Sequence, residues 1–275
     1  MENKIPENNP RKETDQDLTP DQQIRRRTLK AFAWFGLASL VPVGVWKWIK
    51  SRPREAGLPK PFRRFFTFNE QLDKAYFSPQ HLAPTFPKSM AAKKVRVNGY
   101  DGLKKPIDLE TWRLQVEQPT PNGPQKLALT LADLQTLPKQ EIIFEFKCIE
   151  GWSQIQHWGG VRLIDFMTKY KLGTRNGTAP DLNQPDALYS YVGMKTPDNG
   201  YYVGIDMASA LHPQTLLAYE MNGEPLTNPH GAPLRLLIPV KYGVKNLKRI
   251  GEIWFSDSPP RDFWAERGYD YHIGL

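Results

Sequence analysis

The chain has 275 residues, 40% of them hydrophobic, which is enough apolar volume for a sizeable core. Its 25 prolines and 20 glycines disfavour a helical bundle and favour short strands joined by turns. The net charge of +8 is uneven: residues 25–64 carry +10, residues 1–24 carry −3 and residues 65–275 carry +1. Because the bulk of the chain is nearly neutral, it lacks the basic face that nucleic-acid binding requires.

The N-terminal region predicts a tail, an anchor and a linker. Residues 1–24 are polar, and we expect a disordered cytoplasmic tail. Residues 25–50 hold an arginine block and an uncharged run of 16 residues that would span roughly 24 Å as a helix, close to the hydrocarbon thickness of a bilayer. We predict a transmembrane helix there, then a basic linker over residues 51–64 and one folded domain over residues 65–275.

The arginine block also indicates a route of export. Arg25-Arg26-x-x-Leu29-Lys30 resembles the twin-arginine signal, except that Thr28 stands where phenylalanine is usual. That pathway exports folded proteins, which suits a protein loaded with a cofactor in the cytoplasm. No small-x-small cleavage site follows the apolar run, so we expect an uncleaved anchor and a periplasmic domain. A plain signal-anchor helix using the general export route is the alternative.

From about residue 65 the pattern changes to short strands punctuated by turns, which predicts a mixed α+β fold with a strand-rich core. Residues 127–134 are expected to form a strand leading into a short helix, and residues 161–170 a further helix. Residues 94–99 are expected to form a strand that enters a turn, and the other expected strands are 112–116, 141–149, 188–192 and 234–238.

The single cysteine, Cys148, closes the predicted strand 141–149 and cannot form an intramolecular disulfide. On periodicity alone it is most simply a small apolar side chain filling a core face. A segment rich in glycine and tryptophan follows it, over residues 150–160. Such a loop lets the backbone approach a ligand, and a thiolate there would suit a soft transition metal.

At these residues the sequence resembles a known family. The runs Phe146–Ser153 and Trp158–Val161 resemble the molybdopterin-binding domain of the sulfite oxidase superfamily. A second, independent set of runs agrees, and the resemblance extends over roughly residues 65–257. The members of that second set are Gly204–Asp206, Leu216–Leu226, His230–Arg235 and Pro239–Lys248. The resemblance implies a strand-rich fold of the sulfite oxidase type and a molybdenum–molybdopterin cofactor.

The resemblance also implies roles for individual residues. Cys148 would be the catalytic thiolate ligand of molybdenum, with the pterin dithiolene supplying two further sulfurs. His230 and Arg235 would bind the pterin phosphate and ring, because a guanidinium makes a planar fork that suits phosphate. The alternative for Arg235, which alternates with leucines on a strand, is a solvated side chain.

Three further cofactor contacts follow from the same resemblance. Asn246 and Lys248 occupy the segment that also holds the pterin in the family. Lys248 could instead belong to a solvated edge, since it sits in the basic run 241–249. Asn69 matches an early asparagine that contacts the cofactor in the bacterial branch of the family.

The departures from the family point to the type of reaction. Sulfite oxidases carry an arginine-rich stretch after the metal cysteine, whereas Glu150 stands here and would repel sulfite. The pattern Cys-x-Glu-x-Trp-Ser is similar to the branch that includes periplasmic methionine sulfoxide reductases. Glu150 is the candidate catalytic proton relay, and its alternative is a structural carboxylate that caps the turn at Gly151-Trp152.

The sequence therefore predicts a molybdenum-dependent periplasmic oxidoreductase that transfers an oxygen atom, reducing a small-molecule or protein sulfoxide. It contains no Cys-x-x-Cys-His haem motif, so we expect electrons from a membrane cytochrome b-type subunit. One alternative is an oxidase of a small sulfur compound that passes electrons to a soluble periplasmic cytochrome c. Another is a metal-free, membrane-tethered binding module.

Overall fold

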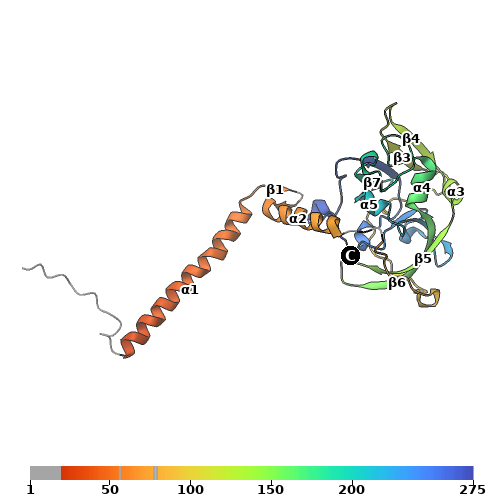
Figure 1. The fold of residues 1–275 in the computed structure, drawn as a ribbon. Coiled ribbons are helices and arrows are strands. Elements are labelled where there is room, and N and C mark those ends of the chain that lie inside the picture. Colours follow the sequence, from red (N-terminus) through yellow and green to blue (C-terminus); the bar gives the residue numbers. More distant parts are fainter. Residues whose placement is uncertain (1–19, 56, 77, 79, 275) are drawn as a thin grey trace, which may run out of the picture. The chain divides into compact units, whose positions relative to one another are not determined.

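The computed structural model describes residues 20–55, 57–76, 78 and 80–274 (Figure 1). The expected disorder of residues 1–19 lies outside this part of the chain. The described residues form two compact units: one comprises residues up to Arg54 together with Pro59–Pro61, and the other comprises the rest. Each unit is described separately below.

The first unit consists mainly of helix α1 (Pro20–Lys50), which begins inside the segment that we expected to be disordered. Proline is favoured at the first position of a helix because its missing N–H would have no partner there. Within α1, the stretch Arg25–Lys50 is long and apolar enough to cross a membrane, by length and composition only.

Two short strands, β1 (Arg54–Glu55) and β2 (Leu58–Pro59), precede helix α2 (Lys60–Tyr76). Our expectation of strands from about residue 65 is therefore wrong for this segment. Phe62, Phe65 and Phe66 recur at helical spacing, and a period of three to four residues favours a helix over a strand.

The second unit is built on two five-stranded sheets, which confirms the mixed α+β, strand-rich class. The first sheet has the order β10-β9-β6-β5, with β11 also paired to β9, and is antiparallel throughout. Its strands are β5 (Gln140–Lys147), β6 (Ser153–Arg162), β9 (Leu216–Met221), β10 (Glu224–Pro225) and β11 (Arg235–Leu237).

The second sheet has the order β4-β3-β12-β7-β8, with one parallel pair, β12 and β3. Its strands are β3 (Leu114–Gln118), β4 (Gln125–Leu129), β7 (Tyr191–Lys195), β8 (Tyr202–Asp206) and β12 (Glu252–Ser256). The remaining helices are α3 (Leu131–Gln135), α4 (Leu163–Tyr170) and α5 (Met207–Ala210). Short 3₁₀ turns are η1 (Lys88–Met90), η2 (Pro185–Ala187), η3 (Asn228–His230), η4 (Gly243–Lys245) and η5 (Ala265–Arg267).

Most of the predicted strands are present with shifted ends, but one prediction is wrong, and five strands of the second unit were not predicted: β6, β8, β9, β10 and β12. Residues 94–99 form no strand, and their backbone is held by side chains instead: Arg96 N donates to Gln154 Oε1 at 3.0 Å. Strand β6 occupies most of the segment that we predicted to be a loop. The sequence pattern did not predict this strand because it contains Gly159 and Gly160, and glycine is uncommon in strands.

Gly160 is required by the packing of β6 on β9. A Cβ atom at this position would lie 2.2 Å from Leu217 O, and the register of the two strands shifts between Gly159 and Gly160. The irregularity is a β-bulge, which bends a strand and re-aims its side chains. The bulge lies directly after Trp158, which lines the site described below.

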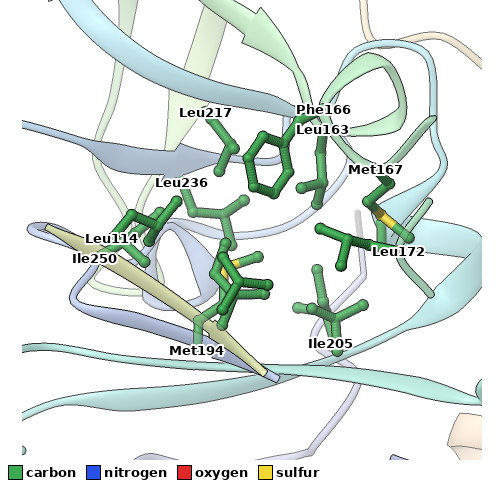
Figure 2. Packing of buried hydrophobic residues seen from close by; sticks show 14 of the residues in the cluster. Leu114, Leu163, Phe166, Met167, Leu172, Met194, Ile205, Leu217, Leu236 and Ile250 are labelled. Carbon is green, nitrogen blue, oxygen red and sulfur yellow. The ribbon is translucent and has the colours of Figure 1, made fainter. Parts of the chain in front are cut away.

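The main core lies between the two sheets and is closed by α4 (Figure 2). Leu163, Phe166 and Met167 of α4 are fully buried against it. Both sheets contribute, for example Met194 from β7 and Leu217 from β9. A second cluster, around Phe144 and Trp158, covers the other face of the first sheet. Buried side chains therefore pack against both faces of the sheet that contains β5 and β6.

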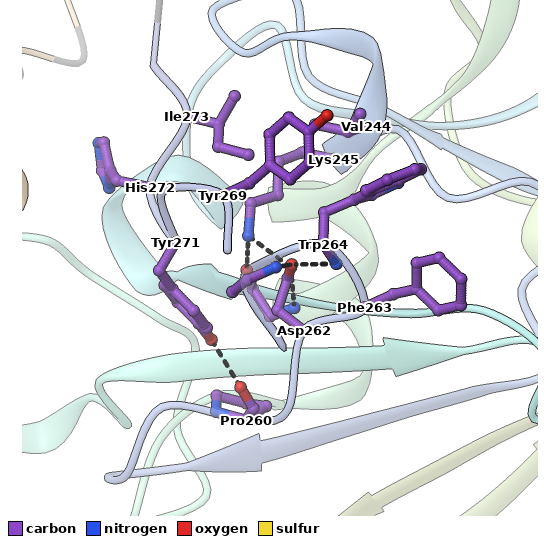
Figure 3. A network of polar contacts seen from close by, with 12 residues as sticks. Val244, Lys245, Pro260, Asp262, Phe263, Trp264, Tyr269, Tyr271, His272 and Ile273 are labelled. Carbon is purple, nitrogen blue, oxygen red and sulfur yellow. Dashed lines mark hydrogen bonds and ion pairs between the residues drawn. The ribbon is translucent and has the colours of Figure 1, made fainter. Parts of the chain in front are cut away.

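The C-terminal segment is fixed to the core by a buried ion pair (Figure 3). Lys245 Nζ lies 2.5 Å from Asp262 Oδ2, and both side chains are at most 2% exposed. The other carboxylate oxygen of Asp262 accepts from the N–H groups of Trp264 and Ala265 at 3.2 and 3.0 Å. Lys245 also donates to Gly204 O at 2.9 Å. One pair thus ties strand β8, the η4 turn and the C-terminal segment together.

Removing one partner of this pair should destabilise the fold strongly, because the other charge would stay buried and uncompensated. We expect Lys245→Met to lower the free energy of unfolding by about 3–5 kcal/mol, measured by urea denaturation of the full chain in detergent. Adding Asp262→Asn should restore part of the loss.

The exposed pair Lys126–Glu117 provides the matched control, since its side chains are 67% and 46% exposed. Lys126→Met should change the free energy of unfolding by less than about 1 kcal/mol. Equal effects of Lys245→Met and Lys126→Met would show that the buried pair does not fix the C-terminal segment.

Candidate functional site

A cavity of about 330 Å³ opens beside the turn between β5 and β6. The structure brings six of the seven predicted site residues to its wall, although they come from three separate parts of the sequence. They are Cys148, Glu150, His230, Arg235, Asn246 and Lys248.

Cys148 lies immediately after β5 and is 7% exposed. Its N–H donates to Trp152 O at 2.9 Å, and Gly151 N donates back to Cys148 O at 3.1 Å, which closes a tight turn. Gly151 has a φ of +86°, a conformation that glycine adopts without strain. The turn holds the thiol at the cavity wall, where a metal or another electrophile could meet it.

Glu150 is exposed at the tip of the same turn. One of its carboxylate oxygens accepts from the indole Nε1 of Trp152 at 3.1 Å. The indole ring of Trp152 stacks on Phe146 with ring centroids 5.9 Å apart. The capping contact that we had given as the alternative for Glu150 is therefore present, and the second carboxylate oxygen is left for a further proton contact.

His230 uses both ring nitrogens within the protein. Nε2 lies 3.3 Å from Val95 O and Nδ1 lies 2.9 Å from Thr227 Oγ1. Since a carbonyl only accepts, Nε2 carries the proton and Nδ1 accepts from the hydroxyl. Burial lowers the pKa of His230 and favours this neutral form. The ring thereby secures the segment that begins at Val95.

Arg235, at the start of β11, is buried and only 3% exposed, so the solvated alternative is wrong. Its guanidinium donates to His230 O at 3.0 Å and to Asn246 O at 3.4 Å, and lies 4.6 Å from the Trp158 ring centroid. No carboxylate pairs with it among the residues that the structure describes. Burial lowers its pKa to about 9.

Lys248 is also withdrawn from water and surrounded by carbonyl groups. Its Nζ lies 2.5 Å from Asn98 O, 3.1 Å from Gly99 O and 3.0 Å from Pro229 O. Desolvation by burial, assisted by the charge of Arg235, lowers the pKa of Lys248 to about 7. The solvated-edge alternative for Lys248 is therefore wrong.

Asn246 supports the loop through both ends of its side-chain amide. Its Oδ1 accepts from Ile238 N at 2.6 Å, and its Nδ2 donates to Tyr242 O at 3.1 Å. Its backbone carbonyl accepts from Arg235. Asn246 also lines the cavity, so it stays a predicted cofactor contact, and its carbonyl helps to position Arg235.

Asn69 is the predicted residue that the structure keeps out of the cavity. It lies on α2 and lines a neighbouring hollow, which shares Ile149 and Tyr269 with the cavity. The asparagine that does enter is Asn98, whose Nδ2 lies 3.5 Å from Cys148 Sγ. The dipeptide Asn98-Gly99 is a turn signal. We interpreted it as the turn that ends a strand and did not place it at the cavity.

Sequence reasoning also missed residues that approach the cavity from other segments. The guanidinium of Arg96 lies 4.6 Å from the ring centroid of Trp152, so a cation stands close to the turn that carries Glu150. This cation comes from another segment and not from the stretch after Cys148, where Glu150 stands. Tyr201, Trp264 and Tyr269 complete the wall. None of these residues belongs to a local motif, so only the fold brings them to Cys148.

The cavity wall contains buried polar atoms that have no partner within the described protein. They are Gln156 Oε1, Trp158 Nε1 and Arg235 Nε. Buried polar atoms are usually paired, so a group of unpaired donors and an acceptor indicates a polar ligand. A pterin offers ring donors and acceptors together with an anionic phosphate, and Cys148 offers a sulfur for a soft metal. The residues present therefore fit a molybdenum–pterin group.

Comparison with known proteins gives the following matches. The model of the oxidoreductase molybdopterin binding domain matches residues 102–264. A protein of Azospira oryzae named as a protein-methionine-sulfoxide reductase subunit, YedZ1, is 34% identical over 209 residues, covering 75% of this chain and 73% of that protein. The protein-methionine-sulfoxide reductase catalytic subunit MsrP of Campylobacter jejuni is 33% identical over 174 residues, covering 59% and 54%.

The chain thus spans about half the length of the MsrP relatives that it matches. Among solved structures, the sulfane dehydrogenase SoxCD from Paracoccus pantotrophus aligns with a TM-score of 0.46 at 18% identity. That alignment covers 66% of this chain and 47% of the other. Similarity of this extent carries no conclusion about activity.

The depressed pKa of Lys248 should make the stability of the cofactor-free chain depend on pH. Its pKa is about 7 in the folded chain and lies near 10.4 when unfolded, so the unfolded chain binds more protons between these values. Stability should therefore rise from pH 7 to pH 9, with a slope of at most about 1.4 kcal/mol per pH unit from this group.

The measurement is urea unfolding of the cofactor-free chain at several pH values. We expect Lys248→Met to flatten the slope and Lys169→Met, at an exposed lysine of α4, to leave it unchanged. An unchanged slope in Lys248→Met would show that this lysine is not desolvated in the folded chain.

Proposed function

The chain belongs to the family of oxidoreductases that share a molybdopterin-binding domain, and on that premise we propose that it is a periplasmic reductase that removes an oxygen atom from a sulfoxide. It is a molybdopterin-dependent enzyme at the level of its family. The observation that carries the proposal is the cavity itself, where a buried thiol, a buried unpaired arginine and an exposed carboxylate converge.

The residues that would hold the cofactor lie on the inner wall of the cavity. Cys148 would bind the metal through sulfur, and Arg235 and Lys248 would compensate the negative charge of the pterin phosphate. Gln156 and Trp158 would pair with the heterocycle through their unpartnered atoms. When bound, the molybdenum–molybdopterin group supplies a two-electron oxygen-atom transfer, which the amino acids alone cannot perform.

The side chains control the proton and the position of the reacting groups. Glu150 holds a proton acceptor at the mouth, oriented by the indole N–H of Trp152, and would deliver the protons needed when an oxygen atom leaves as water. Asn98 Nδ2 donates towards Cys148 Sγ, and hydrogen bonds to a ligand sulfur tune the reduction potential of a metal. The ammonium group of Lys248 donates a hydrogen bond to the backbone carbonyl of Asn98 and so holds Asn98 in place.

The reductase direction rests on the relatives, several of which are named as protein-methionine-sulfoxide reductase subunits. The aromatic side chains of Phe146, Trp152 and Tyr269 at the cavity would favour a thioether-like substrate, since sulfur contacts aromatic rings well. Electrons would come from a membrane cytochrome b-type subunit, and α1 would hold the enzyme beside it.

The oxidase direction is the second candidate, and the position of Arg96 favours it. A cation beside Trp152 would attract a small anionic sulfur compound, whose electrons would then pass to a soluble cytochrome c. The metal-free binding module is not supported, because the chain belongs to a family of molybdopterin-dependent oxidoreductases and Cys148 lies in the cavity wall.

Two assays on the purified full chain distinguish the directions. Oxidation of a reduced viologen by a methionine-sulfoxide peptide would support the reductase. Reduction of ferricytochrome c by sulfite or thiosulfate, without the first activity, would favour the oxidase instead.

Cofactor content tests the site directly. Wild-type protein from a host that makes the cofactor should contain about one molybdenum and one pterin per chain. Cys148→Ala should lose the metal–sulfur signal and the activity. Arg235→Met should lose pterin, although its cofactor-free form should be no more than about 1 kcal/mol less stable, because a buried unpaired cation stabilises little. Wild-type protein without metal from such a host would contradict the proposal.

Glu150→Gln separates the proton relay from the capping contact. The amide keeps an oxygen that can accept from Trp152 but cannot carry a proton at neutral pH. We therefore expect turnover to fall by about 10²-fold with unchanged molybdenum content. The exposed Glu224, which does not line the cavity, is the control. A Glu150→Gln variant with the turnover of the wild type would leave only the capping role.

A further inference from the structure

Helix α2 exposes one apolar face. Phe62, Phe65, Phe68 and Leu72 recur every three or four residues and are 39%, 60%, 54% and 42% exposed. They therefore share one side of the helix, which we call the phenylalanine face. Large apolar side chains that are exposed singly need no explanation, but a continuous row of three phenylalanines and a leucine indicates a surface that something else covers.

The opposite side of α2 is fixed to the folded domain, so the phenylalanine face cannot turn inward. Arg63 Nη2 donates to Ala265 O at 2.8 Å, and Arg63 Nη1 donates to Tyr269 O at 3.2 Å. About two turns further along, Glu70 Oε1 accepts from Tyr271 N at 3.3 Å. These contacts, seven positions apart, define the rotation of the helix about its axis.

The chain connects this face to a candidate membrane segment. Only nine residues, 51–59, separate the end of α1 from the start of α2, a length of about 35 Å when fully extended. The end of α1 carries features typical of a bilayer interface: Lys50 lies 5.0 Å from the ring centroid of Trp46, and Arg52 lies 4.4 Å from that of Trp48.

The charge around α2 suits a lipid surface better than another protein core. Residues 25–64 carry a net charge of +10, and the exposed Lys60 and Arg64 stand beside the phenylalanine face rather than within it. An amphipathic helix with phenylalanines on one side and cations at its flank binds at the boundary between headgroups and acyl chains. Anionic headgroups strengthen such binding through the cations.

We propose that the phenylalanine face of α2 lies in the surface of an anionic lipid bilayer and holds the folded domain against it. The inference rests on the proposed membrane location but not on the proposed reaction. Asn69 and Leu72 of α2 line the hollow that shares Ile149 and Tyr269 with the cofactor cavity. Docking through α2 would therefore bring that side of the cavity close to the membrane, where an electron donor embedded in the bilayer can reach it.

Depth measurements on the full chain in vesicles test the proposal. An environment-sensitive fluorophore is attached in turn through Phe65→Cys, Phe68→Cys, Gln71→Cys and, as a reference within α1, Val45→Cys. The wild-type chain, which carries Cys148 alone, is labelled in parallel to give the background. The vesicles contain phosphatidylcholine with about one third phosphatidylglycerol, and the quencher is a lipid spin-labelled near the headgroup.

We expect the labels at positions 65 and 68 to be quenched about threefold more strongly than the label at position 71, which lies on the polar side of α2. The difference should shrink in pure phosphatidylcholine. Equal, weak quenching at positions 65, 68 and 71 would overturn the proposal, whatever position 45 reports. An unquenched label at position 45 would separately contradict the membrane anchor.

A second variant removes the apolar surface without touching the contacts of Arg63 and Glu70. Phe65→Ser combined with Phe68→Ser, with the fluorophore at Leu72→Cys, should lose the quenching seen when Leu72→Cys is labelled alone. Quenching that is restored at positions 65 and 68 only when a membrane haem protein is added would assign the face to a protein partner and overturn the lipid proposal.

Discussion

Arg235 and Lys248 are both withdrawn from water at the cavity wall, and neither meets a carboxylate among the described residues. Backbone carbonyls take the place of water: those of His230 and Asn246 around Arg235, and those of Asn98, Gly99 and Pro229 around Lys248. Carbonyl dipoles solvate a cation without neutralising it. The cavity therefore retains positive charge that can bind an anionic ligand. Without such a ligand, the buried charge lowers the stability of the fold.

The contacts of His230 and Lys248 also position the segment that carries Asn98. His230 holds Val95 O and Lys248 holds the carbonyls of Asn98 and Gly99, so two residues from the C-terminal third position a segment some 130–150 residues away in the sequence. That segment delivers Asn98 to the sulfur of Cys148. Gly231 permits the arrangement, because a Cβ atom there would lie 2.9 Å from the Cα of Lys248. A site built in this way is rigid before any ligand arrives, which reduces the entropy lost on binding.

The far wall of the cavity depends on the buried pair Lys245–Asp262. Asp262 orders the backbone that carries Trp264, and Lys245 directly precedes Asn246 in the η4 turn. Helix α2 joins this wall through Arg63 and Glu70. The C-terminal segment therefore links the cofactor cavity to the face of α2 that we assign to the membrane.

The sequence by itself identified the family, the mixed α+β class and six residues that share one cavity. This was possible because Cys148 and Arg235 sit in long local motifs whose order along the chain is itself informative. The local sequence pattern predicted the wrong secondary structure where contacts with distant residues determine the backbone conformation. Residues 94–99 alternate like a strand, but their backbone hydrogen bonds go to Gln154, His230 and Lys248, so no strand forms.

Only the tertiary structure decided which asparagine reaches the sulfur and which cations lose their water. Asn69 and Asn98 both precede Cys148, and their order along the chain does not distinguish them. Arg235 and Lys248 could each have been solvated, since burial depends on what packs over a side chain and not on its neighbours in sequence. Their lowered pKa values follow from that burial, because the charged form of a basic group is disfavoured wherever carbonyls and aromatic rings replace water.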